Sequence, residues 1–178
     1  MTSYVAMLRG INVSGRNRLA MAELRALVVA VGGTGVQTYI QSGNAVFQSR
    51  RASSSLVGLL EKELESTLGS HVPVLLRTGQ ELATVLDGNP FVRPGHDTGS
   101  LHVTFMGAVP DPEVVVAAGK RKADRDEFQV VGREVYLLCP NGYGNTKLTN
   151  AFFEKKLGSE ATTRNWKTVN KLVEMTQE

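Results

Sequence analysis

Apolar residues recur along the first 78 positions with the spacings of alternating strands and amphipathic helices. Short apolar runs predict buried strands, at residues 4–8, 36–41, 44–48 and 72–78. Between them, apolar side chains return every three or four residues, as on a helix face that packs against a core. These positions are Leu24, Leu27, Val28 and Val31, and then Leu56, Leu59, Leu60, Leu64 and Leu68. The order β-α-β-β-α-β predicts a ferredoxin-like, split βαβ subdomain over residues 1–88.

Glycine and serine residues predict where these elements begin and end. Gly32-Gly33 follows the first helical stripe and is expected to end that helix, because glycine adopts left-handed geometry at little cost. Ser42-Gly43 is expected to form a two-residue hairpin turn. Ser53 or Ser54 is expected to cap the second helix.

The same kind of pattern begins again after a Pro- and Gly-rich stretch at 89–99, which is expected to be a linker. A short helix near 81–86 precedes this stretch. Strands are predicted at 101–106, 127–131 and 134–139, and helices at 112–119, 147–157 and 165–176. Asn145 or Thr146 is the expected cap of the 147–157 helix. We therefore expect an α+β fold whose second subdomain, residues 100–178, is related to the first and ends in two helices.

Composition narrows the class of protein. Hydrophobic residues make up 42% of the chain, which excludes an intrinsically disordered protein. A single cysteine excludes a disulfide framework and a cysteine-ligated zinc site. No run reaches the roughly 20 apolar residues of a membrane helix, and Met1–Ser3 leads into a strand with no signal-peptide pattern. We expect a cytoplasmic protein that does not associate with membranes.

Charge is distributed unevenly along the chain. Residues 1–51 carry six arginines against one acid, Glu23, whereas residues 52–119 carry three basic side chains against eight acidic ones. Residues 120–178 again have a small basic excess. Two interpretations stay open: solvated faces of opposite sign, or a basic end that meets an anionic partner.

Polar and basic residues of the first subdomain are expected to gather at one edge of its sheet. In a split βαβ sheet, the end of the first strand, the start of the first helix and the turn between the second and third strands lie together. The residues placed there are Arg9, Gly10, Asn12, Arg16, Gln41, Ser42 and Asn44. Guanidinium, amide and free N–H groups donate to phosphate or carboxylate oxygens. The alternative is that the asparagine, serine and glycine residues are ordinary turn residues.

A second glycine-containing junction, residues 141–147, joins a predicted buried strand to a predicted helix. We interpret it either as another anion-receiving helix start, with Tyr143 and Lys147 as donors, or as an ordinary capped turn. Arg164 and Asn165 lie at the start of the last helix and are candidates to face a cleft. Trp166 follows them and has the spacing of a core residue.

Motifs that approach known nucleotide sites are incomplete. Residues 10–17 read G-x-x-x-x-G-R-N, without the lysine and the hydroxyl residue of a Walker A loop. Tyr143 and Lys147 have the Y-x-x-x-K spacing of short-chain dehydrogenases, but no G-x-G-x-x-G follows a predicted strand. An RNA-recognition sheet would need paired aromatic residues where only Phe47 is present. No cofactor is predicted.

Metal binding and nucleophilic catalysis receive little support from the sequence. His96, Asp97 and His102 do not have the spacing of metal ligands on one element, so no metal site is predicted. Cys139 ends an apolar run and is interpreted as a buried small hydrophobe. No G-x-S-x-G sequence is present to place a catalytic serine.

Four segments, Leu8–Val13, Tyr39–Asn44, Lys147–Asn150 and Thr163–Trp166, resemble those of the bacterial family called domain of unknown function 1697. The resemblance runs from about Tyr4 to Leu172. It implies an α+β fold with ferredoxin-like halves and implies no activity. This chain departs from the family pattern at Ser14, where a second glycine is frequent, and at Arg16, where lysine is frequent.

We therefore expect a protein that binds an anionic, phosphate-bearing ligand, a nucleotide or a nucleic acid, at the basic glycine-containing loops. The alternative is an enzyme that acts on a polar anionic substrate between the halves with Arg9, Asn44, Tyr143 and Lys147, although no general base is evident beside them. A partner-docking role stays open, and the sequence predicts no oligomeric state.

Overall fold

The computed structural model describes residues 1–95, 97–119 and 125–178. The chain divides into two compact units, Met1–Thr84 with Leu172–Glu178, and Val85–Lys171. Each unit contains a four-stranded antiparallel sheet. The expected ranges were 1–88 and 100–178, whereas in the structure the last seven residues of the chain group with the first unit.

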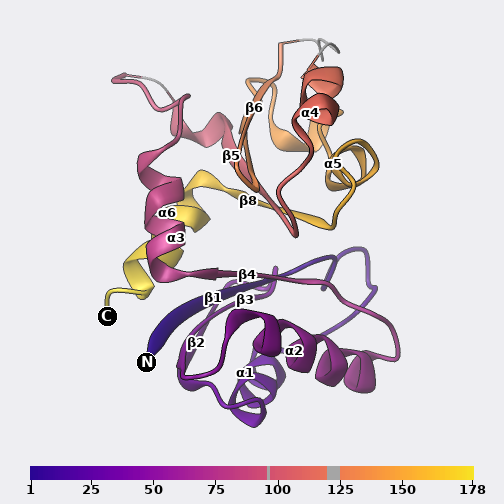
Figure 1. Cartoon of the computed structure of the whole chain (residues 1–178), viewed down its shortest axis with the longest axis vertical. Helices are drawn as coiled ribbons and strands as arrows, with labels where there is room; N and C mark the ends of the chain where they lie inside the picture. Colours follow the sequence, from indigo (N-terminus) through magenta and orange to yellow (C-terminus); the bar gives the residue numbers. More distant parts are fainter. Residues whose placement is uncertain (96, 120–124) are drawn as a thin grey trace. The chain divides into compact units, whose positions relative to one another are not determined.

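The first unit has the predicted β-α-β-β-α-β order. Its elements are β1 (Thr2–Leu8), α1 (Met21–Ala30), β2 (Thr34–Tyr39), β3 (Asn44–Ser49), α2 (Ser53–Leu68) and β4 (Val74–Thr78). The strand order is β2-β3-β1-β4, and α1 and α2 cover one face of this sheet (Figure 1). Leu24 and Val28 of α1 are buried with Leu56, Leu60 and Leu64 of α2, as the helical stripes predict.

Two local predictions for the first unit are wrong. Tyr39 pairs with Asn44, so the hairpin loop has four residues, Ile40–Gly43, instead of the expected two. The loop closes over the end of β1, because the Leu8 amide donates to the Gly43 carbonyl at 2.9 Å. The N-cap of α2 is Ala52, with no side-chain hydrogen bond, and Ser53 already lies inside the helix.

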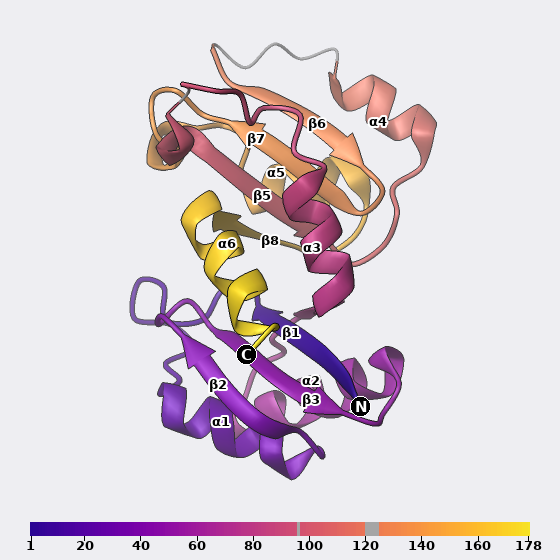
Figure 2. The same cartoon turned by 90° about the vertical axis from the view of Figure 1, so that its left-hand side faces the viewer.

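The second unit repeats this connectivity. Its strands and the helices around them are α3 (Gly79–Asp87), β5 (Leu101–Met106), α4 (Pro112–Gly119), β6 (Glu127–Val131), β7 (Glu134–Leu138), α5 (Asn150–Leu157), β8 (Ala161–Asn165) and α6 (Trp166–Met175). The strand order is β6-β7-β5-β8 (Figure 2). The division between the units falls within α3 and within α6. No helix in the described part of the chain is long and apolar enough to cross a membrane.

The structure corrects two predictions for the second unit. Residues 161–165 form the fourth strand, β8, where the sequence suggested only the start of a helix; Thr163 pairs with Thr104 of β5. In addition, α5 begins at Asn150 with Thr149 as its cap, so neither Asn145 nor Thr146 caps it. Tyr143–Asn145 instead makes a single 3-10 turn.

The two fourth strands end in the same way. Arg77 and Arg164 are the penultimate residues of β4 and β8, and both are buried. The next residue caps the following helix in each case: the Glu81 amide donates to Thr78 Oγ1 at 3.1 Å, and the Thr168 amide donates to Asn165 Oδ1 at 2.8 Å. Thus the two units share this strand-end arrangement as well as their strand order.

Candidate functional site

Residues 9–18, here called the arm, form a small hairpin between β1 and α1. The Arg16 amide donates to the Val13 carbonyl at 3.0 Å. Ser14 and Gly15 between them have φ values of 50° and 75°, and two successive positive φ values are the signature of a type I′ turn. Because α1 starts only at Met21, the glycine-rich stretch does not run directly into a helix as a Walker A loop does.

Asn12 fastens the arm to the hairpin turn at 40–43. Its Nδ2 donates to the carbonyls of Leu19 and Gln41 at 2.9 and 2.8 Å, and its Oδ1 accepts from the Leu19 amide at 2.9 Å. The structure therefore brings Asn12 and Gln41 together. The same bonds commit the Asn12 amide to the main chain, which is the role of an ordinary turn residue.

Several other predicted site residues also hold loop structure. Asn44 is fully buried, and its Nδ2 donates to the Tyr39 carbonyl and to Ser42 Oγ at 2.9 and 3.0 Å. The Gly10 carbonyl accepts from Asn17 Nδ2 at 3.3 Å. The Arg9 amide donates to the Pro73 carbonyl at 3.0 Å. These contacts stabilise the conformation of the loops, and they do not by themselves indicate that these residues bind a ligand.

A surface hollow of about 650 Å³ lies beside the arm. Its lining residues are Asn12, Gly15, Arg18, Leu19, Ala20, Glu23 and Gln41. Only Asn12 and Gln41 were expected at the site from the sequence. Arg18 and Glu23 were missed, although Glu23 is the only acid in the first 51 residues and this contrast was the available signal.

Two arginines lie at the end of the arm's turn and just after it. Arg16 and Arg18 are exposed, and Arg18 Nη2 lies 3.8 Å from the position that a Cβ on Gly15 would take. The Arg18 guanidinium thus folds back over the turn that Arg16 ends. Two cations that share a turn repel one another, and an anion between them relieves this repulsion.

The start of α1 is already occupied by a carboxylate. Glu23 Oε2 accepts from the Ala20 amide at 2.9 Å, which is one half of a capping box and places a negative charge at the positive end of the helix. The lining of the hollow therefore includes one cation and one anion, and the Glu23 carboxylate lies at the helix start where the sequence suggested an anionic ligand.

In the second unit, Tyr143 packs on a buried histidine. The rings of His102 and Tyr143 stack with centroids 4.8 Å apart, and within the described residues His102 Nδ1 makes no hydrogen bond. Burial lowers the pKa of His102, and the main chain of Ser100 partly opposes that change. His102 is therefore neutral at pH 7.

The remaining candidates of the second unit do not form an open helix start. Lys147 is exposed and lies before Thr149, the cap of α5. Asn165 caps α6. Arg164 is buried and donates from Nη1 to Thr162 Oγ1 at 2.8 Å. Burial lowers the pKa of Arg164 to about 10, with Tyr143 opposing the change, so its guanidinium stays protonated at pH 7.

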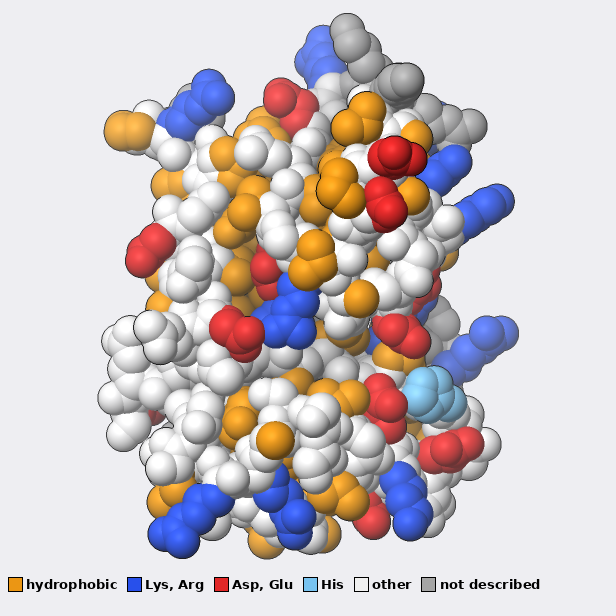
Figure 3. Space-filling view, viewed as in Figure 1, with side chains coloured by type: hydrophobic (Ala, Val, Ile, Leu, Met, Phe, Trp, Pro, Cys, Tyr) orange, Lys and Arg blue, Asp and Glu red, His pale blue; other side chains and the backbone are white. Residues whose placement is uncertain are grey.

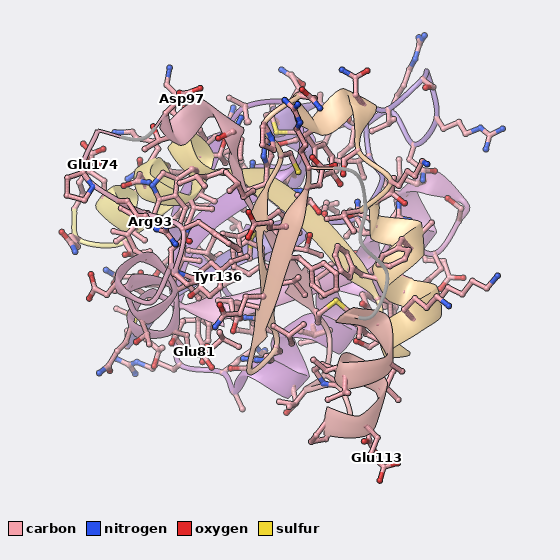
Figure 4. All side chains as sticks on the ribbon, turned by 90° about the horizontal axis from the view of Figure 1, so that it is seen from above. Glu81, Arg93, Asp97, Glu113, Tyr136 and Glu174 are labelled. Atoms are coloured by element: carbon pink, nitrogen blue, oxygen red, sulfur yellow. The ribbon has the colours of Figure 1, made fainter. Side chains whose placement is uncertain are left out.

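Other reactive groups of the second unit are also buried. Cys139 lies in the core, as expected, and burial raises the pKa of its thiol to about 11. Burial likewise raises the pKa of Tyr136 to about 12; its hydroxyl donates to the Val85 carbonyl at 2.8 Å (Figure 4). Among the described residues, no three His, Cys, Asp or Glu side chains form a metal site, and His96 lies outside those residues.

On the face drawn in Figure 3, Lys and Arg side chains are interspersed with Asp and Glu. The regional charge surplus of the sequence does not produce a continuous basic patch on that face. The arm therefore has to be considered as a local site.

The family model described as "Protein of unknown function (DUF1697)" matches residues 1–136. The chain belongs to this family. Its fold is also that of the conserved bacterial protein SP0830 from Streptococcus pneumoniae, which is 22% identical. The two chains align over 100% of this one and 99% of the other, with a TM-score of 0.75. No curated protein matches.

The segments that resemble DUF1697 meet in pairs. Leu8–Val13 contacts Tyr39–Asn44 through the Asn12 bond to Gln41 and through the Leu8 bond to Gly43. In the second unit, Thr163 Oγ1 donates to Asn150 Oδ1 at 2.6 Å, which joins the segments at 147–150 and 163–166. In each unit, the two segments that resemble the family are therefore joined to one another by hydrogen bonds.

Proposed function

We propose that this protein binds a phosphate-bearing anion at the arm and the adjoining hollow of its first unit. The observation that carries the proposal is a pair of exposed arginines at one turn: Arg16 is its last residue, and the Arg18 guanidinium lies over it. Among the described residues, no acidic side chain pairs with either guanidinium. Arginine suits phosphate oxygens because its planar fork donates two parallel hydrogen bonds.

The arm is a rigid support for such a contact. Asn12 joins it to the neighbouring turn through one hydrogen bond, to Gln41, and to Leu19 through two more. Ser70 Oγ also donates to Asn17 Oδ1 of the arm at 2.8 Å. A preorganised loop loses little conformational entropy when it binds, so more of the interaction energy appears as affinity. The proposal includes the cytoplasmic location expected from the sequence.

The groups with shifted pKa values do not favour an enzyme. They are His102, Tyr136, Cys139 and Arg164, all buried in the second unit. None of these four residues belongs to the arm or lines the hollow. Binding is therefore the better-supported class of function.

The test measures binding of pyrophosphate and ATP by calorimetry at low salt, with sodium chloride at matched ionic strength as the reference. Arg16→Gln and Arg18→Gln should each weaken binding about tenfold, because each removes a charge-assisted hydrogen bond. Arg50→Gln is the matched control, since Arg50 is exposed and follows β3 at the end away from the hairpin turn. Equal losses in all three variants, or no binding above the salt reference, would refute the proposal.

A further inference from the structure

We infer that the ligand of the arm and hollow is a mononucleotide with a ribose diol, and not bare phosphate or a nucleic-acid chain. This inference rests on the proposed function and specifies its ligand. It follows from the mixed lining of the hollow, where Arg18, Glu23 and Gln41 meet around about 650 Å³.

The Glu23 carboxylate would be an unfavourable neighbour for a bare phosphate. It is exposed, and one of its oxygens, Oε2, caps α1 through the Ala20 amide. Within the described part of the chain, no hydrogen bond engages its second oxygen, Oε1. A carboxylate repels phosphate but accepts hydrogen bonds from sugar hydroxyls, as the acidic residue of dinucleotide-binding folds does with ribose. Arg18 and Glu23 in one hollow therefore suit a ligand with a phosphate at one end and hydroxyls beside it.

Gln41 provides the third part of the site. Gln41 is exposed, and the hydrogen bond described for it uses only its main-chain carbonyl, which accepts from Asn12. Its side-chain amide can both donate and accept, as recognition of a base edge requires. Ile40 beside it is 46% exposed and has a φ of 51°, a conformation that is rare for a β-branched residue. The turn thus holds the aliphatic side chain of the residue before Gln41 in solvent.

A nucleic-acid chain fits the arm less well. Affinity for a polyanion grows with the number of phosphates neutralised, and six to ten such contacts are typical of strong binding. The arm offers two exposed cations, Arg16 and Arg18. Residues 10–20 contain no aromatic side chain on which unpaired bases would stack.

The experiment compares three ligand groups on the full chain at low salt: tripolyphosphate, the four ribonucleoside triphosphates, and their 2′,3′-dideoxy counterparts. At least one ribonucleotide should bind about tenfold tighter than its dideoxy counterpart, since a hydrogen bond to a charged group is lost in the latter. Glu23→Gln should abolish this difference and leave tripolyphosphate binding equal or stronger. Glutamine keeps the capping bond to Ala20, and Glu65→Gln on α2, also exposed, is the matched control.

The outcomes separate this inference from the proposed function. If tripolyphosphate and all nucleotides bind alike and Glu23→Gln changes no ratio, the ribose inference is overturned while phosphate binding stands. If a 20-nucleotide DNA binds tighter than every mononucleotide and loses affinity steeply with salt, the ligand is a nucleic acid and the inference is also overturned. If no phosphate compound binds, the proposed function itself fails.

Discussion

Replacing Asn12 with alanine tests whether one side chain holds the arm against the hairpin turn. The change removes three hydrogen bonds of 2.8–2.9 Å, two to Leu19 and one to Gln41. A typical hydrogen bond contributes about 0.5–1.5 kcal/mol, and Asn12 is half-buried, so we expect a loss of about 2 kcal/mol from the bonds alone. Alanine also tolerates the φ of 54° at this position poorly, which adds about 1 kcal/mol.

Asn12→Gly separates these two contributions. Glycine loses the same hydrogen bonds but adopts a positive φ without strain, so it should be less destabilising than alanine at this position. The assay is urea unfolding followed by circular dichroism, combined with hydrogen exchange of peptides that cover 9–19 and 39–44. Exchange in these peptides reports on the arm and turn directly, and both should lose protection together because Asn12 links them.

Two results would show that the reasoning is wrong. One is an Asn12→Ala protein whose free energy of unfolding stays within about 0.5 kcal/mol of the wild type, the range of neutral surface changes. The other is faster exchange in the arm with unchanged protection at 39–44, which would mean that the turn is held by other contacts.

Three further predictions concern the second unit. Thr163→Val should cost about 1–3 kcal/mol in urea unfolding, because it leaves the buried Thr104 hydroxyl without its 2.7 Å partner and also removes the bond to Asn150. The double variant Thr104→Val/Thr163→Val should cost less than the sum of the two single variants, and simple additivity would contradict a shared network. The lowered pKa of His102 means that the unfolded chain takes up a proton near pH 6.5 while the folded chain does not, so stability should fall as the pH drops below about 6.5; His102→Gln should flatten this pH dependence, and an unchanged profile would contradict the assignment. The Cys139 thiol should resist a thiol reagent at pH 8 until the protein is unfolded, because it is buried and its pKa is raised to about 11; rapid labelling of the native protein would show that it is accessible.

Local apolar spacing was sufficient for most elements of this fold. The predicted ranges 101–106, 112–119 and 127–131 coincide with β5, α4 and β6. Each of these segments has its own apolar run or stripe, so the local sequence is enough to predict that it is buried. Their order along the chain was then enough to indicate a ferredoxin-like half, because few topologies accommodate β-α-β-β-α-β.

Only tertiary structure decided the features that depend on distant partners. The sequence Ala161–Asn165 has one apolar residue, and it is a strand because β5 supplies its hydrogen bonds. In the same way, the predicted topology placed the arm near the hairpin turn, but it did not indicate which polar groups would hydrogen-bond to the main chain there. Main-chain partners far along the sequence occupy Asn12, whereas the hollow exposes Arg18 and Glu23. Buried donors and acceptors of a folded unit need hydrogen-bond partners, and polar side chains from anywhere in that unit can supply them. Only the side chains that are not used in this way are available to a ligand.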